Sequence, residues 1–233
     1  MYAIGLFITL FTFQALITLV LMAEDIIRVP QSIYAYFFKM PGQSNFFPER
    51  RKFLSQLAVG LAAIPFASLL YGMYRGRYNY KVLSYVLEYD DLPEAFDGFK
   101  ITQISDIHSG SFDNPDKINY AIDLVNEQNS DLILFTGDIV NTHAKEMHPW
   151  IDNFNRIKKH KYGKFSVLGN HDYGEYVTWP SQKAKDENFE AIKNLYGQID
   201  FKLLLNEHTF ITKGDDKIAL VGVENWGNNF KKA

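Results

Sequence analysis

The feature that most constrains this chain is a set of three short apolar runs, each followed directly by polar residues that can bind metals. Each run has the length and content of a buried β-strand. The runs cover residues 101–104, 132–135 and 165–168, and they lead into Asp106-Ile107-His108, Gly137-Asp138 and Gly169-Asn170-His171-Asp172. Three strand ends that deliver Asp, His, Asp, Asn and His predict a metal site for hydrolysis.

Helical patterns separate these runs and predict an α/β fold with a largely parallel sheet. Asn114-Pro115 has the residue types of a helix N-cap and first helical position. Further helices are expected near residues 147–157 and 181–196. Residues 80–87 are rich in β-formers and predict a first strand; other short strands are expected at 203–205, 209–212 and 217–223, with a hairpin turn at 213–216. In such a sheet the motifs lie at the C-terminal edge, where ligands bind.

Converging Asp, His and Asn side chains suit a pair of metal ions. An Asp and a His two residues apart can reach one ion, an Asp from the next strand end can bridge two ions, and an Asn amide is a neutral ligand. Mixed oxygen and nitrogen ligands favour manganese, iron or zinc over calcium. Two ions about 3.5–4 Å apart hold a phosphate and lower the pKa of a bound water. Each motif alone is more typical of a structural turn, so the prediction depends on their combination.

In these residues the chain resembles the calcineurin-like metallophosphoesterase family. Asp106 and His108 match its Asp-x-His motif, Gly137-Asp138 its Gly-Asp motif, and Gly169-Asn170-His171-Asp172 its Gly-Asn-His-Asp/Glu motif. The resemblance covers residues 98–233 and implies the N-terminal part of a phosphoesterase domain. The implied fold is a partial metallophosphoesterase β-sandwich flanked by helices, with two divalent metal ions that hydrolyse phosphate esters.

The resemblance also implies a role for each matched residue. Metal binding is implied for Asp106, His108, Asp138 and Asn170. Of these, Asp106 and His108 would hold the first metal, Asp138 would bridge, and Asn170 would hold the second. His171 would be the general acid for the leaving oxygen, or would stabilise the transition state, and Asp172 would orient it. A His with a pKa near neutrality suits proton donation.

Two apolar segments precede this region and predict transmembrane helices. Residues 1–23 are uncharged and residues 53–74 form a second apolar block, and about 20 apolar residues span a bilayer core. A secretory signal peptide is the alternative for the first segment, but such peptides begin with positive charge. The positive charge of residues 24–52 predicts a cytoplasmic loop, which places the downstream domain outside the cytoplasm. Residues 75–97 are expected to be a linker containing the first strand.

The membrane segments refine the resemblance. Arg50-Arg51-Lys52-Phe53-Leu54 resembles a twin-arginine export signal, with Glu49 in place of the usual Ser or Thr. Together with the two apolar segments and the Asp-Ile-His form of the first motif, this signal makes the chain most similar to membrane-associated bacterial phosphoesterases. That branch implies the bacterial inner membrane and a phosphomono- or diesterase acting on lipid-linked substrates such as UDP-diacylglucosamine, as in lipid A biosynthesis.

The family's remaining histidines, including a Gly-His-x-His motif, have no match in this sequence. His208 lies between strand-like runs, and we expect it at the surface. We therefore expect an N-terminal fragment of a longer protein, with weak metal binding and little activity of its own. Two alternatives stay open: a non-enzymatic membrane-anchored binding module of the same fold, and an intracellular nucleotide phosphodiesterase if the apolar segments do not span a membrane.

Composition excludes other classes of function. The chain has no cysteine, which excludes a disulfide scaffold and a thiolate metal site. Its net charge of −3 provides no basic field for nucleic acid. The expected partners are therefore a phosphoester substrate and the membrane, and the sequence does not predict an oligomeric state.

Overall fold

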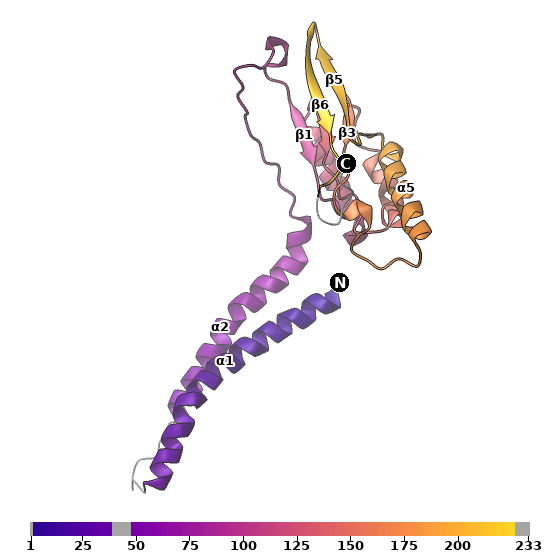
Figure 1. The fold of residues 1–233 in the computed structure, drawn as a ribbon. Helices are drawn as coiled ribbons and strands as arrows, with labels where there is room; N and C mark the ends of the chain where they lie inside the picture. The colour runs from indigo at the N-terminus through magenta and orange to yellow at the C-terminus, as the bar shows by residue number, and fades with distance from the viewer. Residues whose placement is uncertain (1, 39–47, 227–233) are drawn as a thin grey trace. The chain divides into compact units, whose positions relative to one another are not determined.

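The computed structural model describes residues 2–38 and 48–226, which divide into two compact units at residue 81 (Figure 1). The first unit is a pair of helices, α1 (Tyr2–Phe37) and α2 (Pro48–Arg75). The rings of Phe13 and Phe66 lie 5.1 Å apart, and Ala58 and Ala62 are fully buried between the helices. Small residues at this contact allow the two backbones to approach closely.

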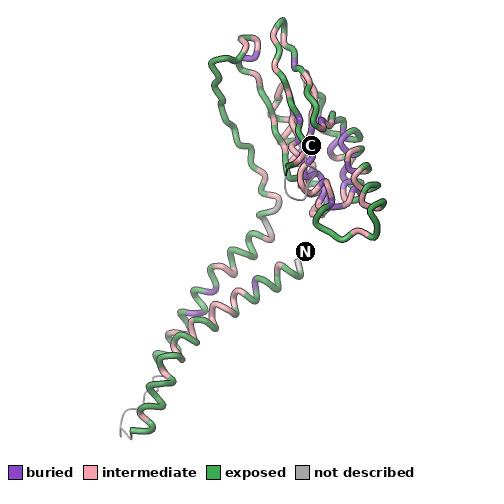
Figure 2. Tube along the Cα trace, in the orientation of Figure 1, coloured by how far each residue is buried: buried purple, intermediate pink, exposed green. Residues whose placement is uncertain are grey.

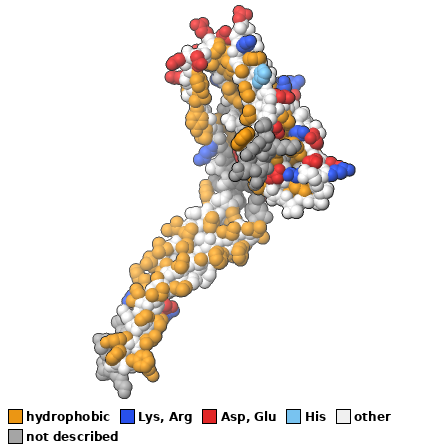
Figure 3. All heavy atoms as spheres, in the orientation of Figure 1, with side chains coloured by type: hydrophobic (Ala, Val, Ile, Leu, Met, Phe, Trp, Pro, Cys, Tyr) orange, Lys and Arg blue, Asp and Glu red, His pale blue; other side chains and the backbone are white. Residues whose placement is uncertain are grey.

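Both helices have the length and composition of membrane spans. The most apolar window of each has a mean hydropathy of 2.3 in α1 and 1.9 in α2, and only 6% and 11% of these windows is buried. A core helix of a soluble domain would be mostly buried. Figure 2 shows exposed residues along most of both helices, and in Figure 3 hydrophobic side chains cover much of their visible face.

The first helix is longer than the sequence pattern predicted. We expected a loop from residue 24, but α1 continues to Phe37. Charged side chains stabilise this extension, because Arg28 forms ion pairs with Glu24 at 3.5 Å and with Asp25 at 2.7 Å. Asp25 also lies 3.8 Å from Arg51, which begins the antiparallel pairing with α2. The part of the predicted loop at 39–47 lies outside the described residues.

The second unit contains the predicted parallel sheet. Its strands are β1 (Ile101–Ile104), β2 (Leu132–Phe135), β3 (Lys164–Ser166) and β4 (Lys202–Leu203), paired in that order and all parallel. The connecting helices are α3 (Pro115–Glu127) and α5 (Gln182–Gln198), whose N-caps Asn114 and Ser181 each accept a hydrogen bond from a backbone N–H of the first turn. The α/β prediction is therefore confirmed.

A second sheet covers one face of the first. It is the hairpin of β5 (Glu207–Lys213) and β6 (Asp216–Gly222). Leu132 of β2 belongs to a buried cluster with Ile211 of β5, whereas Phe135, on the opposite face of the same strand, packs its ring 5.3 Å from Tyr196 of α5. The parallel sheet thus lies between the hairpin and the helices, as a partial sandwich.

Two local predictions were wrong. Residues 79–89 form neither helix nor strand, and Val86 is 88% exposed, because no described strand pairs with this β-prone segment. The helix expected over 147–157 shortens to a single turn, α4 (Ile151–Phe154), preceded by the 3-10 turn His148–Trp150. Other 3-10 turns are Gly76–Tyr78, Glu94–Phe96, Ser109–Ser111, Ala144–Glu146 and His171–Tyr173.

Candidate metal centre

The predicted motifs meet at the C-terminal edge of the parallel sheet. The loops that leave β1 and β2 are joined by backbone hydrogen bonds. The Asp106 N–H donates to the Gly137 carbonyl at 3.1 Å, and the His108 N–H donates to the Asp138 carbonyl at 2.9 Å. These bonds continue the pairing of β1 and β2 past the strand ends, and so bring the first two motifs together.

Three of the predicted metal ligands have left-handed backbone conformations. The φ angles are 54° at Asp106, 48° at His108 and 58° at Asp138. Such angles are uncommon for residues other than glycine, and they cluster at functional sites. Here they turn each loop sharply enough to present its side chain at the edge of the sheet.

The motif glycines let the second and third loops approach. Gly137 has a φ of +95°, and a Cβ atom at this position would overlap the backbone of Gly169. A Cβ atom on Gly169 would in turn overlap the carboxylate and backbone N–H of Asp138. Both positions therefore require glycine for the two loops to lie this close.

Three side chains converge at this edge, one from each loop. The candidate ligand atoms of His108, Asp138 and His171 all lie within 4.8 Å of one another. His108 Nε2 lies 3.7 Å from Asp138 Oδ2, and the rings of His108 and His171 are perpendicular with centroids 4.6 Å apart. Asp138 Oδ1 also accepts the backbone N–H of His171 at 2.8 Å, which ties the second loop to the third.

The other two predicted ligands flank this group. Asp106 has a side chain that is 68% exposed, and its Oδ1 lies 3.9 Å from His108 Nε2. Its Oδ2 accepts a hydrogen bond from the Ser105 hydroxyl at 2.6 Å. Asn170 is partly buried and donates from Nδ2 to the Tyr176 hydroxyl at 2.7 Å. The structure thus places His171, which we expected to be an acid, among the converging side chains, whereas the Asp106 carboxylate lies outside this group.

The Asn141 carbonyl, and not Asp172, orients the His171 ring. His171 Nδ1 lies 2.8 Å from that oxygen, so Nδ1 carries the proton and Nε2 is left for a metal or for a transferred proton. We expected Asp172 to hold this ring. Its carboxylate instead accepts the N–H groups of Asp138, Ile139 and Gly169, at 2.9–3.0 Å.

Asp172 is a fully buried anchor beneath the site. Besides the three backbone donors, the Tyr196 hydroxyl donates to it at 2.8 Å. Burial raises the pKa of Asp172 to about 6, and the donors only partly offset this, because the nearby Asp138 charge acts in the same direction as burial. Burial also raises the pKa of Tyr196 well above its usual value, so the phenol stays a donor. The carboxylate therefore fixes the backbone that carries the converging residues.

Glu146 holds the loop that supplies the Asn141 carbonyl. Its carboxylate accepts the N–H groups of Asn141 at 2.6 Å, Thr142 at 3.3 Å and His143 at 3.1 Å. Glu146, Asn141 and Tyr176 were not predicted from the sequence. Glu146 closes a capping box with His143, but this box lacks the Ser or Thr that usually marks one in a sequence. Asn141 and Tyr176 lie in loops and carry no sequence signal of their contacts with His171.

The converging residues fit a divalent metal ion. Two imidazoles and a carboxylate are a donor set typical of zinc, manganese or iron. The backbone carbonyl bond of His171 is the kind of contact that orients metal-binding histidines. The left-handed backbone of the predicted ligands Asp106, His108 and Asp138 costs conformational free energy, and such strain is typically found at functional sites.

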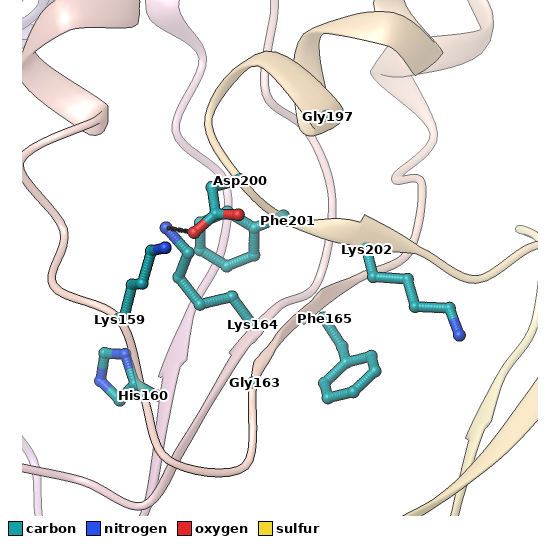
Figure 4. Close-up of a pocket in the computed structure, with 9 residues that line it drawn as sticks. All are labelled: Lys159, His160, Gly163, Lys164, Phe165, Gly197, Asp200, Phe201 and Lys202. Carbon is teal, nitrogen blue, oxygen red and sulfur yellow. Dashed lines mark ion pairs between the residues drawn. The ribbon is translucent and has the colours of Figure 1, made fainter.

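A hollow of about 470 Å³ lies at the opposite edge of the sheet from the converging residues (Figure 4). Lys164, whose side chain is 4% exposed, forms an ion pair there with Asp200 at 3.1 Å and donates to the Ile199 carbonyl at 3.2 Å. Figure 4 shows Lys202 pointing away from this pair. The charge of Lys164 is thus neutralised within the fold, and its role is structural.

Comparison with known families finds two matches that together cover most of the chain. A family described as "Calcineurin-like phosphoesterase" matches residues 99–231. A second, described as "Probable Calcineurin-like phosphoesterase, transmembrane domain", matches residues 1–77. The first match contains the converging residues, and the second contains both apolar helices.

Individual relatives agree with these matches. The "Uncharacterized metallophosphoesterase YkuE" of Bacillus subtilis is 32% identical over 133 residues, 55% of this chain and 46% of that protein. The zebrafish (Danio rerio) "Transmembrane protein with metallophosphoesterase domain" is 27% identical over 66% of this chain and 33% of its own length. The "UDP-2,3-diacylglucosamine pyrophosphatase LpxG" of Chlamydia muridarum is 35% identical over 91 residues, 37% of this chain and 27% of that protein. The chain thus spans less than half the length of each.

Proposed function

The chain belongs to the calcineurin-like phosphoesterase family, and from this premise we propose that it forms part of a membrane-anchored, metal-dependent phosphoesterase. The observation that carries the proposal is the convergence of His108, Asp138 and His171 within 4.8 Å at the C-terminal edge of the sheet. A structural turn needs neither imidazole. The transmembrane-domain match over residues 1–77 supports the anchor.

The metal-binding set in this proposal is Asp106, His108, Asp138 and Asn170. Asp106 and His108 would hold one ion, Asn170 would hold a second, and the Asp138 carboxylate would serve both. Bound divalent ions supply charge for a phosphate and an activated water. Manganese, iron and zinc all suit this mixture of oxygen and nitrogen donors.

His171 holds the proton for the leaving oxygen. Its Nδ1–H is bound to the Asn141 carbonyl, so Nε2 is the atom that carries the transferable proton. Asp172 contributes by accepting the backbone N–H groups of Asp138 and Gly169, which fixes the loops that carry the site. A positioned general acid of this kind contributes about 10²–10⁴-fold to a rate.

The substrate in this proposal is a phosphomono- or diester, and a lipid-linked one such as UDP-diacylglucosamine is the specific candidate. Support for the lipid comes from the two apolar helices and from the similarity to a relative named as a UDP-2,3-diacylglucosamine pyrophosphatase. A membrane anchor keeps an enzyme close to substrates that reside in the bilayer.

The test is hydrolysis by the whole phosphoesterase of which this chain forms part, purified in detergent from membranes, since we expect little activity from residues 1–233 alone. We expect Mn²⁺-dependent cleavage of bis-p-nitrophenyl phosphate, reduced to background by Asp138→Asn and unchanged by Asp152→Asn, an exposed Asp on α4. Parallel assays with p-nitrophenyl phosphate and UDP-diacylglucosamine separate monoester, diester and lipid-linked substrates. Equal rates for wild type and Asp138→Asn would contradict the proposal.

A single variant separates the two roles open to His171. His171→Gln should lower the rate by about 10²-fold or more while the metal content stays at the wild-type level, since the histidine acts as an acid. If metal content falls in step with activity, His171 is a ligand and the proton donor lies elsewhere.

A further inference from the structure

An aromatic loop between Asp172 and α5 flanks the metal centre. It covers residues 173–180 and includes two tyrosines and a tryptophan. Of these three aromatic residues Tyr176 is the exposed one, at 57% of full exposure, and it contacts both Asn170 and His171. None of the roles assigned above explains this residue.

The loop is held firmly in place. The Trp179 indole N–H donates to the Gly174 carbonyl at 2.7 Å, and the Trp179 ring packs edge-on against His143 with centroids 5.0 Å apart. Glu175, next to Tyr176, forms an ion pair with Lys185 of α5 at 2.7 Å. The backbone position of Tyr176 is therefore fixed by contacts of the residues before and after it in the loop, and not by its own exposed side chain.

Tyr176 makes two contacts with the residues of the third motif. Its hydroxyl accepts a hydrogen bond from Asn170 Nδ2 at 2.7 Å. Its ring lies over the His171 imidazole, with centroids 4.6 Å apart and planes inclined by 31°. The Asn141 carbonyl fixes the Nδ1 end of the same imidazole. The histidine is thus held at one nitrogen and on one face.

We propose that Tyr176 is a positioning residue, which turns the Asn170 amide so that its oxygen serves as the ligand and which holds the His171 ring in place. This inference rests on the proposed function. A neutral amide can present either its NH₂ group or its oxygen to a metal, and only the oxygen binds. With Nδ2 committed to the tyrosine hydroxyl, Oδ1 accepts no hydrogen bond from any other residue that the structure describes.

The two contacts of Tyr176 have separable effects. The hydroxyl acts on Asn170 and therefore on metal affinity. The ring acts on His171 and therefore on the rate with metal bound. Residues that orient a metal ligand typically change metal affinity by about 10–100-fold. A side chain this exposed contributes little to the packing of the domain, so its loss should leave the fold intact.

The test compares Tyr176→Phe, which removes only the hydroxyl, with Tyr176→Leu, which also removes the ring. Tyr120→Phe, at an exposed tyrosine on α3, is the matched control. The first readout is the side-chain amide signal of Asn170 in chain labelled with ¹⁵N-asparagine, assigned by its loss in Asn170→Asp. The second is Mn²⁺ affinity measured by electron paramagnetic resonance, and thermal unfolding serves as the check on the fold.

We expect Tyr176→Phe to shift the Asn170 amide signal and to weaken Mn²⁺ binding by about tenfold or more, with an unchanged unfolding temperature. Tyr176→Leu should in addition lower the rate at saturating Mn²⁺. An Asn170 signal that is the same in Tyr176→Phe and wild type would overturn the inference. The amide signal needs neither metal nor activity. Failure of the whole phosphoesterase to bind Mn²⁺ would therefore count against the proposed function alone, and the amide comparison would still decide whether Tyr176 positions Asn170.

Discussion

At the scale of single residues, Asp172 shows why a motif residue can matter without touching substrate. Its carboxylate is fully buried and accepts four hydrogen bonds, from three backbone N–H groups and the Tyr196 hydroxyl. Two of the backbone donors follow Gly137 and one belongs to Gly169. The Asp172 carboxylate therefore links the second and third motif loops, and we expect its loss to lower the free energy of unfolding.

We expect Asp172→Asn to lower the free energy of unfolding of the second unit by about 1–3 kcal/mol, because the amide NH₂ would face a backbone donor and leave it unpaired. Tyr196→Phe removes a single donor and should cost about 0.5–1.5 kcal/mol. Urea unfolding followed by tryptophan fluorescence measures both. An Asp172→Asn variant as stable as wild type but inactive would show that the carboxylate acts in the chemistry itself.

At the scale of elements, the site depends on a turn that lies outside the three motifs. Glu146 binds the backbone N–H groups of residues 141–143, and the carbonyl of Asn141 in that turn positions the His171 ring. The turn thus couples the loop after β2 to the motif after β3. A mutation that loosens this turn should therefore change the orientation of the His171 ring while the proposed metal ligands stay the same.

Glu146→Gln tests this coupling. One of the three N–H groups would then face the glutamine NH₂, so the turn should loosen and the His171 Nδ1 proton should exchange with water faster. Activity should fall by about 10–100-fold, the range seen when a supporting contact of a metal site is lost. Nitrogen-15 spectra of the histidines and the phosphodiesterase rate provide the measurements. Glu127→Gln, at an exposed position at the end of α3, is the control and should change neither.

Element patterns were the most predictable part of the fold. The run Leu132–Phe135 is predicted and observed with the same bounds, Asn114 caps α3 as its type indicates, and the helix expected over 181–196 is observed as α5. These features depend on neighbours in the sequence. The contacts of Glu146 and Tyr176 also join residues within six positions of each other, but they depend on the conformation of irregular loops, which the residue types alone did not reveal. The strand predicted over residues 80–87 is absent for a related reason. Residues with high β-propensity form a strand only where another strand is available to pair with them.

At the scale of the whole molecule, the first unit governs where the chain resides. An α-helix of the 36 residues in α1 would be about 54 Å long, more than the roughly 30 Å of a bilayer core. The charged group of Glu24, Asp25, Arg28 and Arg51 lies beyond the uncharged segment that the sequence marked as membrane-spanning. The length of a helix and the length of its membrane span are therefore different quantities here, and the span over residues 1–23 stays a prediction.

We expect the chain to stay in the membrane pellet after alkaline carbonate extraction, because both helices expose apolar surface along their length. We also expect protease added to intact spheroplasts to cut within the exposed residues 79–89, as the proposed placement outside the cytoplasm requires. Lysed cells provide the control for protease access. Release by carbonate would contradict the membrane anchor, whereas protection in spheroplasts alone would contradict only the orientation.

The left-handed backbone at Asp106, His108 and Asp138 has a consequence for how such a protein evolves. Glycine would suit each of these angles better than an acid or a histidine does, so the fold gives up as much as about 1 kcal/mol of stability at each position. Selection for stability alone would favour glycine at these positions. The proposed metal site is a reason to keep an acid or a histidine there in spite of that cost.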